Sequence, residues 1–269
     1  MTQVAKAEAF ARLHQGPEVL VLPNAWDAAS AAVAADAGAK AIATSSAAVA
    51  WAHGQADGDI LPVDVTCAMV AEIVRAVDVP VSCDFEGGFT DDLDQLAANI
   101  TRVVEAGAVG INFEDGARDP DLHAHKVQAA RAAADKAGVP LYINARTDIY
   151  LKGLAEGEAA EAEAIRRGKL YVEAGASGVF VPGAADPELI RRLAAAIPAP
   201  LNVIAWPGVP NAKALAGLGA RRLSAGTGTF RAAFAALTRA TQAFLETGDS
   251  DALIAAGQGA PALQKRFSR

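Results

Sequence analysis

Short apolar runs alternate along the chain with longer stretches whose apolar residues recur at helical spacing. Most of these runs follow a glycine or proline by a few residues, which is typical where a helix ends and a strand begins. The runs are apolar on both faces, as expected for strands of a parallel sheet that helices cover. The eight runs are EVLVLPNAWD, AKAIATSS, VPVSCDFEGG, AVGINFED, VPLYINARTD, SGVFVPG, APLNVIAWPG and ARRLSAGTG.

This alternation predicts an α/β fold, specifically a (β/α)8 TIM barrel formed as a single domain by residues 1–269. Eight strand–helix units in a chain of this length match the size of that fold. An open doubly wound sheet is the alternative, but no GxGxxG motif follows the first run. Residues 229–269 continue as helix, with a break at 257–261, and exceed what one barrel closure needs. We therefore expect a C-terminal helical extension that contacts another subunit.

The composition narrows the class of protein. A net charge of −7 without any basic cluster disfavours a surface for nucleic acid or anionic membrane. Residues 1–16 carry charges throughout, so they predict a short amphipathic helix rather than a signal peptide. Cys67 and Cys83 offer neither a disulfide framework nor a CxxC metal spacing. A reducing, cytoplasmic setting is therefore expected.

Charged side chains follow three neighbouring runs at their carboxyl ends, where barrels of this type hold their active sites. Asp84 and Glu86 end the third run two residues apart, a spacing that in a strand puts both carboxylates on one face. Glu114 ends the fourth run and Arg146 ends the fifth. At least three carboxylates and one arginine should therefore meet at one mouth of the barrel.

Such a group of carboxylates would be destabilised by repulsion and loss of water unless a cation bound among them. Mg²⁺ suits this donor set, because it accepts one or two carboxylates, several waters and oxygens of a substrate. Zinc is less favoured, since no histidine lies at a strand end. Ion pairs or helix caps are the alternative role for any single carboxylate. For four other carboxylates these structural roles are a better fit than metal binding, namely Asp27, Asp59, Asp115 and Asp148.

Six stretches, in their order and spacing, resemble the isocitrate lyase / phosphoenolpyruvate mutase superfamily. The resemblance extends from about Leu22 to about Gly226. It implies a (β/α)8 barrel whose last helix is exchanged between subunits, usually in a homotetramer. It also implies Mg²⁺ or Mn²⁺ at the barrel mouth. The stretches are LPNAWDAASA, ATSSAAVA, GQAD, CDFEGGF, INFEDG and NARTD.

The resemblance implies roles for individual residues. It makes Asp84 the direct metal ligand, and it places acidic ligands that act through water at Asp57, Glu86 and Glu114. Glu86 stands where the superfamily often has aspartate. Asp57 and Arg146 are the implied catalytic residues. The implied substrate-binding residues are Ser45, Ser46, Ala47 and Arg146, and we add Asp84 and Trp26 as candidates because they lie at the ends of strands.

One segment departs from the superfamily's pattern. Isocitrate and methylisocitrate lyases carry a catalytic cysteine after the fourth strand, and the mutases and phosphonopyruvate hydrolases use a lysine in a longer loop. Residues 116–138 contain no cysteine, and neither Arg118 nor Lys126 aligns with that lysine. Lys126 fits a solvated helix position, and His123 and His125 are expected at the surface. The sequence therefore leaves the general acid or base unassigned.

These features favour a Mg²⁺-dependent carbon–carbon lyase for a small 2-oxo or 2-hydroxy di- or tricarboxylate, similar to oxaloacetate or methylisocitrate. The cation and Arg146 would stabilise charge that develops on an enolate oxygen. Phosphorus–carbon chemistry on phosphonopyruvate and non-catalytic binding of a 2-oxo acid are alternatives at the same site. A sugar-phosphate enzyme using the glycine-rich residues 224–230 is a further alternative, although no lysine ends a strand.

Overall fold

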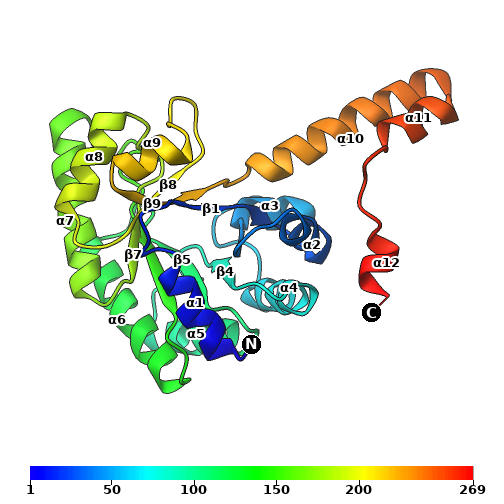
Figure 1. Cartoon of the computed structure of the whole chain (residues 1–269). Coiled ribbons are helices and arrows are strands. Elements are labelled where there is room, and N and C mark those ends of the chain that lie inside the picture. Colours follow the sequence, from blue (N-terminus) through cyan, green and yellow to red (C-terminus); the bar gives the residue numbers. More distant parts are fainter. Residues whose placement is uncertain (269) are drawn as a thin grey trace.

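The computed structural model describes residues 1–268 and confirms the predicted barrel (Figure 1). β1 (Leu20–Leu22) and β2 (Asn24–Ala25) are two parts of one strand that Pro23 interrupts. β1 pairs with β9 (Ala220–Ser224), and β2 pairs with β3 (Ile42–Thr44), so the sheet closes on itself. All neighbours are parallel, in the order β1-β9-β8-β7-β6-β5-β4-β3-β2.

The other barrel elements follow the predicted alternation. The remaining strands are β4 (Val81–Asp84), β5 (Gly110–Glu114), β6 (Tyr142–Arg146), β7 (Gly178–Phe180) and β8 (Leu201–Ile204). The helices are α1 (Gln3–Arg12), α2 (Ala28–Asp36), α3 (Ser46–Ala52), α4 (Val63–Ala76), α5 (Leu93–Glu105), α6 (Pro120–Lys136), α7 (Gly157–Glu173), α8 (Pro187–Ala196) and α9 (Ala212–Gly217). Asp27 caps α2 by accepting from the Ser30 amide, as the sequence predicted for this carboxylate.

A buried polar layer fills the barrel interior beneath its mouth. Asn144 Nδ2 donates to the side-chain oxygens of Asn112 and Asn202, both at 2.9 Å. Arg222 donates to Asn112 Oδ1 at 3.1 Å and to Ser224 Oγ at 3.0 Å. Each of these side chains is buried, so the hydrogen bonds between them form a rigid layer directly beneath the residues at the mouth.

α1 and the turn that follows it close the opposite end of the barrel, where the turn contributes a buried histidine. The His14 ring stacks on Tyr142 with ring centroids 4.0 Å apart, and its Nδ1–H donates to the Phe10 carbonyl at 2.8 Å. Burial, and then repulsion from Arg222, lowers the pKa of His14 to about 3. The folded protein therefore holds this imidazole neutral, whereas the unfolded chain protonates it below pH 6.5.

Acid is therefore expected to destabilise the protein through His14. Because the folded pKa is depressed, the stabilisation is complete above pH 6.5 and is lost as the pH falls toward the folded pKa. The loss from pH 8 to pH 5 is about 2 kcal/mol. Urea unfolding across that range should show a shallower pH dependence for His14→Gln than for wild type. His125→Gln, at an exposed position, should leave the slope unchanged; an unchanged slope in both variants would contradict this assignment.

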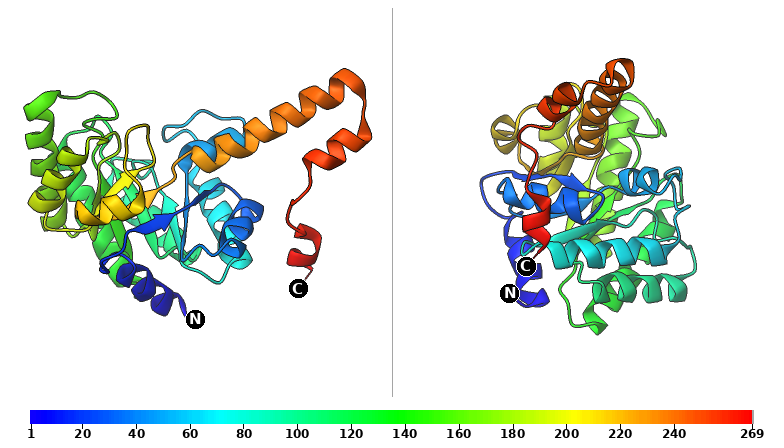
Figure 2. Two further views of the ribbon diagram at one scale, coloured as in Figure 1. Left: turned by 45° about the horizontal axis from the view of Figure 1, so that its top comes forward. Right: turned by 90° about the vertical axis from the view of Figure 1, so that its right-hand side faces the viewer.

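The C-terminal residues form the predicted helical extension. α10 (Gly228–Thr247) runs away from the barrel, α11 (Ser250–Ala256) turns back, and α12 (Leu263–Phe267) lies at the end of a separate return segment (Figures 1 and 2). α10 is exposed over most of its length. In residues 1–268, no helix combines the length and apolar character required to cross a membrane.

Candidate functional site

A cavity of about 160 Å³ opens at the carboxyl ends of the strands. It brings together six of the residues that the sequence singled out, namely Ser45, Ser46, Ala47, Asp57, Asp84 and Arg146. Ser224, Gly226 and Thr227, from the glycine-rich residues 224–230 of the sugar-phosphate alternative, also line it. The other lining residues had no role in the sequence predictions: Asn24, Asn112, Leu151, Phe180, Pro182, Ile204 and Trp206. The polar groups come mainly from β3 to β6, whereas the apolar side chains follow β6, β7 and β8.

Asp84, the last residue of β4, is held from both neighbouring strands. Its Oδ2 accepts from the Ser46 backbone amide at 2.9 Å, and its Oδ1 lies 3.4 Å from Asn112 Nδ2. Its own amide donates to Thr44 Oγ1 at 2.7 Å. Asn112 lies two residues before Glu114, and this spacing in the sequence already placed the two side chains on one face of β5, although it gave Asn112 no role.

Glu86 lies beyond the strand on which its prediction relied. β4 ends at Asp84, and Glu86 occupies a turn with φ of +49°, so the assumption of strand parity was wrong. Both carboxylates nevertheless border one small enclosed space beside Thr44. The Glu86 carboxylate accepts from the amides of Gly58 and Asp59. Burial raises the pKa of Glu86 to about 7.

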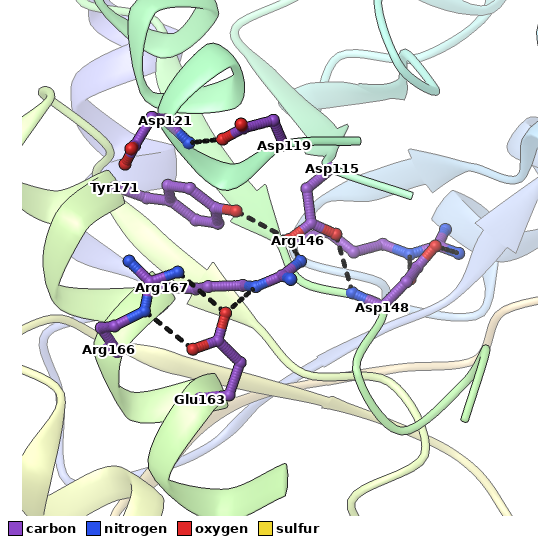
Figure 3. Close-up of polar contacts among 9 residues, drawn as sticks. All are labelled: Asp115, Asp119, Asp121, Arg146, Asp148, Glu163, Arg166, Arg167 and Tyr171. Carbon is purple, nitrogen blue, oxygen red and sulfur yellow. Dashed lines mark hydrogen bonds and ion pairs between the residues drawn. The ribbon is translucent and has the colours of Figure 1, made fainter. Parts of the chain in front are cut away.

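Arg146 bridges two carboxylates at the cavity edge. Its Nη1 lies 2.6 Å from Glu114 Oε2, while Nε and Nη2 donate to the two oxygens of Asp148 at 2.6 and 3.1 Å (Figure 3). The sequence predicted a cap or ion pair for Asp148, and the structure makes it a partner of the site's arginine. Burial, together with the surplus negative charge from Asp148, raises the pKa of Glu114 despite the arginine.

Asp115 anchors this ion pair to the outer helix layer. Asp115 Oδ1 accepts from the Asp148 amide at 3.0 Å. Its Oδ2 accepts from Arg167 Nη1 at 2.9 Å and from the Tyr171 hydroxyl at 2.7 Å (Figure 3). These partners lie 33 to 56 residues away in the sequence, so local spacing could not have revealed the network. It fixes Asp148, and through it the Arg146 guanidinium.

Comparison with known proteins decides the family. A family model described as phosphoenolpyruvate phosphomutase matches residues 10–245. The chain belongs to this family. It is 30% identical to 2-methylisocitrate lyase of Bacillus subtilis, over 74% of this chain and 67% of the relative. Oxaloacetate decarboxylase of Pseudomonas fluorescens is 29% identical, with coverage of 84% and 80%. A Burkholderia cenocepacia J2315 structure, provisionally named a phosphonomutase, has a TM-score of 0.85 and 41% identity, with coverage of 88% and 99%.

Three other side chains of this family member lie differently from their sequence predictions. Trp26 packs against Phe230, with ring centroids 5.0 Å apart, and is not among the cavity-lining residues. Lys126 is not solvated: its side chain is buried, and its Nζ lies 2.7 Å from Asp91. His123 is buried rather than at the surface. The predictions for Lys126 and His123 did not anticipate that α6 buries polar side chains against α5 and α7.

The cavity offers a donor set for Mg²⁺ but not a complete cage. Within residues 1–268, no three His, Cys, Asp or Glu side chains lie close enough together to hold a metal ion unaided. Mg²⁺ usually keeps several waters and needs only one or two carboxylates. Asp84 and Asp57 line the same cavity, and burial followed by repulsion from Asp84 raises the pKa of Asp57. These residues therefore fit a hydrated Mg²⁺ with few direct protein ligands.

Proposed function

We propose that this family member is a Mg²⁺-dependent carbon–carbon lyase acting on a small 2-oxo or 2-hydroxy acid. The observation that carries the proposal is one cavity in which Arg146 lies with Asp84, Asp57 and residues 45–47. The Ser45 and Ser46 amides donate to the Ala25 carbonyl and to Asp84. The Ser46 side chain hydrogen-bonds to Asp57, so the Ala47 amide remains to orient a substrate carboxylate.

Decarboxylation of an oxaloacetate-like acid is the simplest reaction for these groups. The bond from C3 to its carboxylate breaks, CO₂ leaves, and the electron pair shifts through C2 to the keto oxygen. Arg146 would stabilise that enolate oxygen. Bound Mg²⁺, held by Asp84 directly and by Asp57, Glu86 and Glu114 through water, would supply Lewis-acid polarisation of the keto group. Asp57 would deliver the proton that C3 then takes up.

Decarboxylation is also consistent with the kinds of side chain that are missing from the cavity lining, because it does not require them. No His, Lys or Cys belongs to its lining in residues 1–268. Cleavage of a 2-hydroxy acid needs a base to remove the hydroxyl proton, and Asp57 is the best-placed carboxylate for that step. Phosphorus–carbon chemistry is the second candidate, because a relative of 41% identity carries the provisional phosphonomutase name.

A substrate panel tests this proposal. With Mg²⁺, we expect turnover of at least one of oxaloacetate, 2-methylisocitrate and 2,3-dimethylmalate, lost with EDTA and regained with Mg²⁺ or Mn²⁺. Phosphorus NMR with phosphonopyruvate is run in parallel. Turnover of the phosphonate alone would favour the second candidate. Binding of 2-oxo acids without any turnover would favour a non-catalytic binder.

We also propose that copies of the chain exchange α10, as in a homotetramer. α10 follows β9, yet it leaves the barrel instead of covering it (Figures 1 and 2). An apolar groove of about 420 Å³ stays open between β1, β9 and α2, lined in part by Val21, Ala34 and Leu223. α10 exposes a stripe of large apolar residues, Phe234, Leu237 and Phe244. The helix of a second copy would cover both surfaces.

Leu237→Glu is expected to convert the oligomer to smaller species, because a carboxylate would enter the apolar contact. Leu237 is 58% exposed, so the single chain should tolerate the change. Sedimentation velocity measures the outcome, with Gln242→Glu on another face of α10 as the matched control. A wild-type chain that sediments as a monomer at micromolar concentration would contradict helix exchange.

A cytoplasmic setting forms part of the same proposal. Cys67 and Cys83 are both free thiols. Cys83 is fully buried in the core, and burial raises its pKa. Unpaired thiols are typical of proteins in reducing compartments.

A further inference from the structure

The loop between α3 and α4, residues 53–61, carries Asp57 to the cavity. Most of this loop is exposed, and Asp59 is only half-buried. The Gly58 and Asp59 amides donate to the Glu86 carboxylate, in the turn that follows β4. The position of Asp57 therefore depends on a few polar contacts rather than on apolar packing of the loop.

Arg118, in the segment between β5 and α6, ties this loop to the rest of the barrel. Its Nη2 donates to Asp59 Oδ2 at 2.8 Å, and its Nε donates at 3.0 Å to Asp91 Oδ1, in the segment before α5. Asp59 Oδ1 accepts from the amides of Gly87 and Phe89 at 3.1 and 3.3 Å. One guanidinium thus links the connections that follow three neighbouring strands, β3, β4 and β5.

The charges of this contact are balanced within the protein. Lys126 is buried, and its Nζ lies 2.7 Å from the same Asp91 oxygen that Arg118 contacts. Two cations therefore pair with two carboxylates, Asp59 and Asp91, and the ion pairs leave no net charge to attract a ligand. Neither Arg118 nor Lys126 is among the cavity-lining residues. The contact is therefore suited to holding the loop rather than to binding a substrate.

Backbone strain is concentrated at the same contact. Within residues 1–268, the non-glycine residues with positive φ are Asp59 at +57°, Glu86 at +49° and Phe89 at +64°. Each lies either in the loop or in the turn against which the loop is held. Such conformations cost free energy and persist only where the surrounding contacts impose them. Relaxation of this strain would favour release of the loop once Arg118 was removed.

We propose that Arg118 is a positioning residue that, through Asp59, holds residues 53–61 against the turn after β4 and keeps Asp57 at the cavity. This inference rests on the proposed function, in which Asp57 delivers the proton. Because Arg118 lies outside the lining, it affects the reaction only through the loop. Loss of its guanidinium should therefore slow turnover and leave substrate binding beside Arg146 little changed.

Arg118→Gln tests the proposal with two readouts. Hydrogen–deuterium exchange of peptides that cover residues 53–61 should become about tenfold faster, because a charge-assisted hydrogen bond no longer holds the loop. At saturating Mg²⁺, and with an acid that the wild type turns over, kcat should fall about tenfold while KM changes by less than about twofold. Arg118→Lys keeps the charge but lacks the fork, so it should recover part of both losses.

Gly87→Ala disturbs the same contact without removing a charge. A Cβ at Gly87 would overlap the Arg118 guanidinium and lie 2.8 Å from Asp59 Oδ2, so the ion pair would have to open. Gly87→Ala should therefore reproduce both effects. Arg192→Gln is the matched control, because it removes an ion pair with Glu161 between α8 and α7, away from the cavity lining. It should change neither readout.

The outcomes separate this inference from the proposed function. Unchanged exchange in Arg118→Gln would overturn the hold on the loop. Faster exchange with an unchanged kcat would overturn the positioning role, because the hydrogen bond from the Ser46 side chain would then suffice to place Asp57. A wild type that turned over no acid would overturn the proposed function, and the exchange comparison would still decide whether Arg118 holds the loop.

Discussion

Asp84→Asn is expected to lower Mg²⁺-dependent turnover by about 10³-fold or more, because the proposed direct metal ligand loses its charge. The fold should survive, since the asparagine oxygen can still accept the Ser46 amide that Asp84 now holds at 2.9 Å. Steady-state kinetics over a Mg²⁺ titration, together with the thermal unfolding midpoint, measure the two effects separately.

Asp27→Asn is the matched control for this substitution. Asp27 caps α2, and asparagine is an equally good N-cap, so both turnover and unfolding should stay near wild type. Asp148 would be a poor control because it pairs with Arg146. Equal losses of turnover in Asp84→Asn and Asp27→Asn would remove Asp84 from the metal site.

Arg146→Met is expected to damage both catalysis and folding. Without the guanidinium, kcat/KM should fall by about 10²- to 10³-fold, because the developing oxyanion loses its charged partner. The free energy of unfolding should fall by about 3–5 kcal/mol, since Glu114 and Asp148 would remain as buried, uncompensated carboxylates. Enzyme kinetics and urea unfolding at pH 8 measure these two changes.

A second substitution separates the two roles of Arg146. Arg146→Met combined with Glu114→Gln removes one of the stranded carboxylates, so it should recover part of the lost stability. It should not recover turnover. If the double variant regained activity along with stability, Arg146 would have only a structural role, and the proposed reaction would lose its oxyanion partner.

The barrel was predictable because its signals are local and repeated. The alternating apolar runs and the glycines that end the helices predicted all eight strand positions. Asp84, Glu114 and Arg146 were singled out because they are charged residues at the ends of these runs. Pro23 was visible in the first run, but whether it would divide the strand depended on both neighbouring pairings.

The site was less predictable where tertiary contacts override local spacing. Glu86 leaves its strand because the turn directs its carboxylate to the amides of Gly58 and Asp59, nearly 30 residues earlier. Lys126 is buried because Asp91 pairs with it from the preceding strand–helix unit. Asp148 lies only two residues after Arg146, so their ion pair is local, but Asp148 is also held by Asp115, 33 residues earlier, and no local spacing encodes that contact.

The most direct measurement of the central claim is a crystal structure with Mn²⁺ and oxalate, a planar dianion that resembles the enolate of a 2-oxo acid. The account predicts an anomalous peak at Asp84, with oxalate on the metal, one carboxylate near Ser46 and Ala47, and an oxygen facing Arg146. Mn²⁺ bound elsewhere, or oxalate bound at the mouth without metal at Asp84, would contradict it.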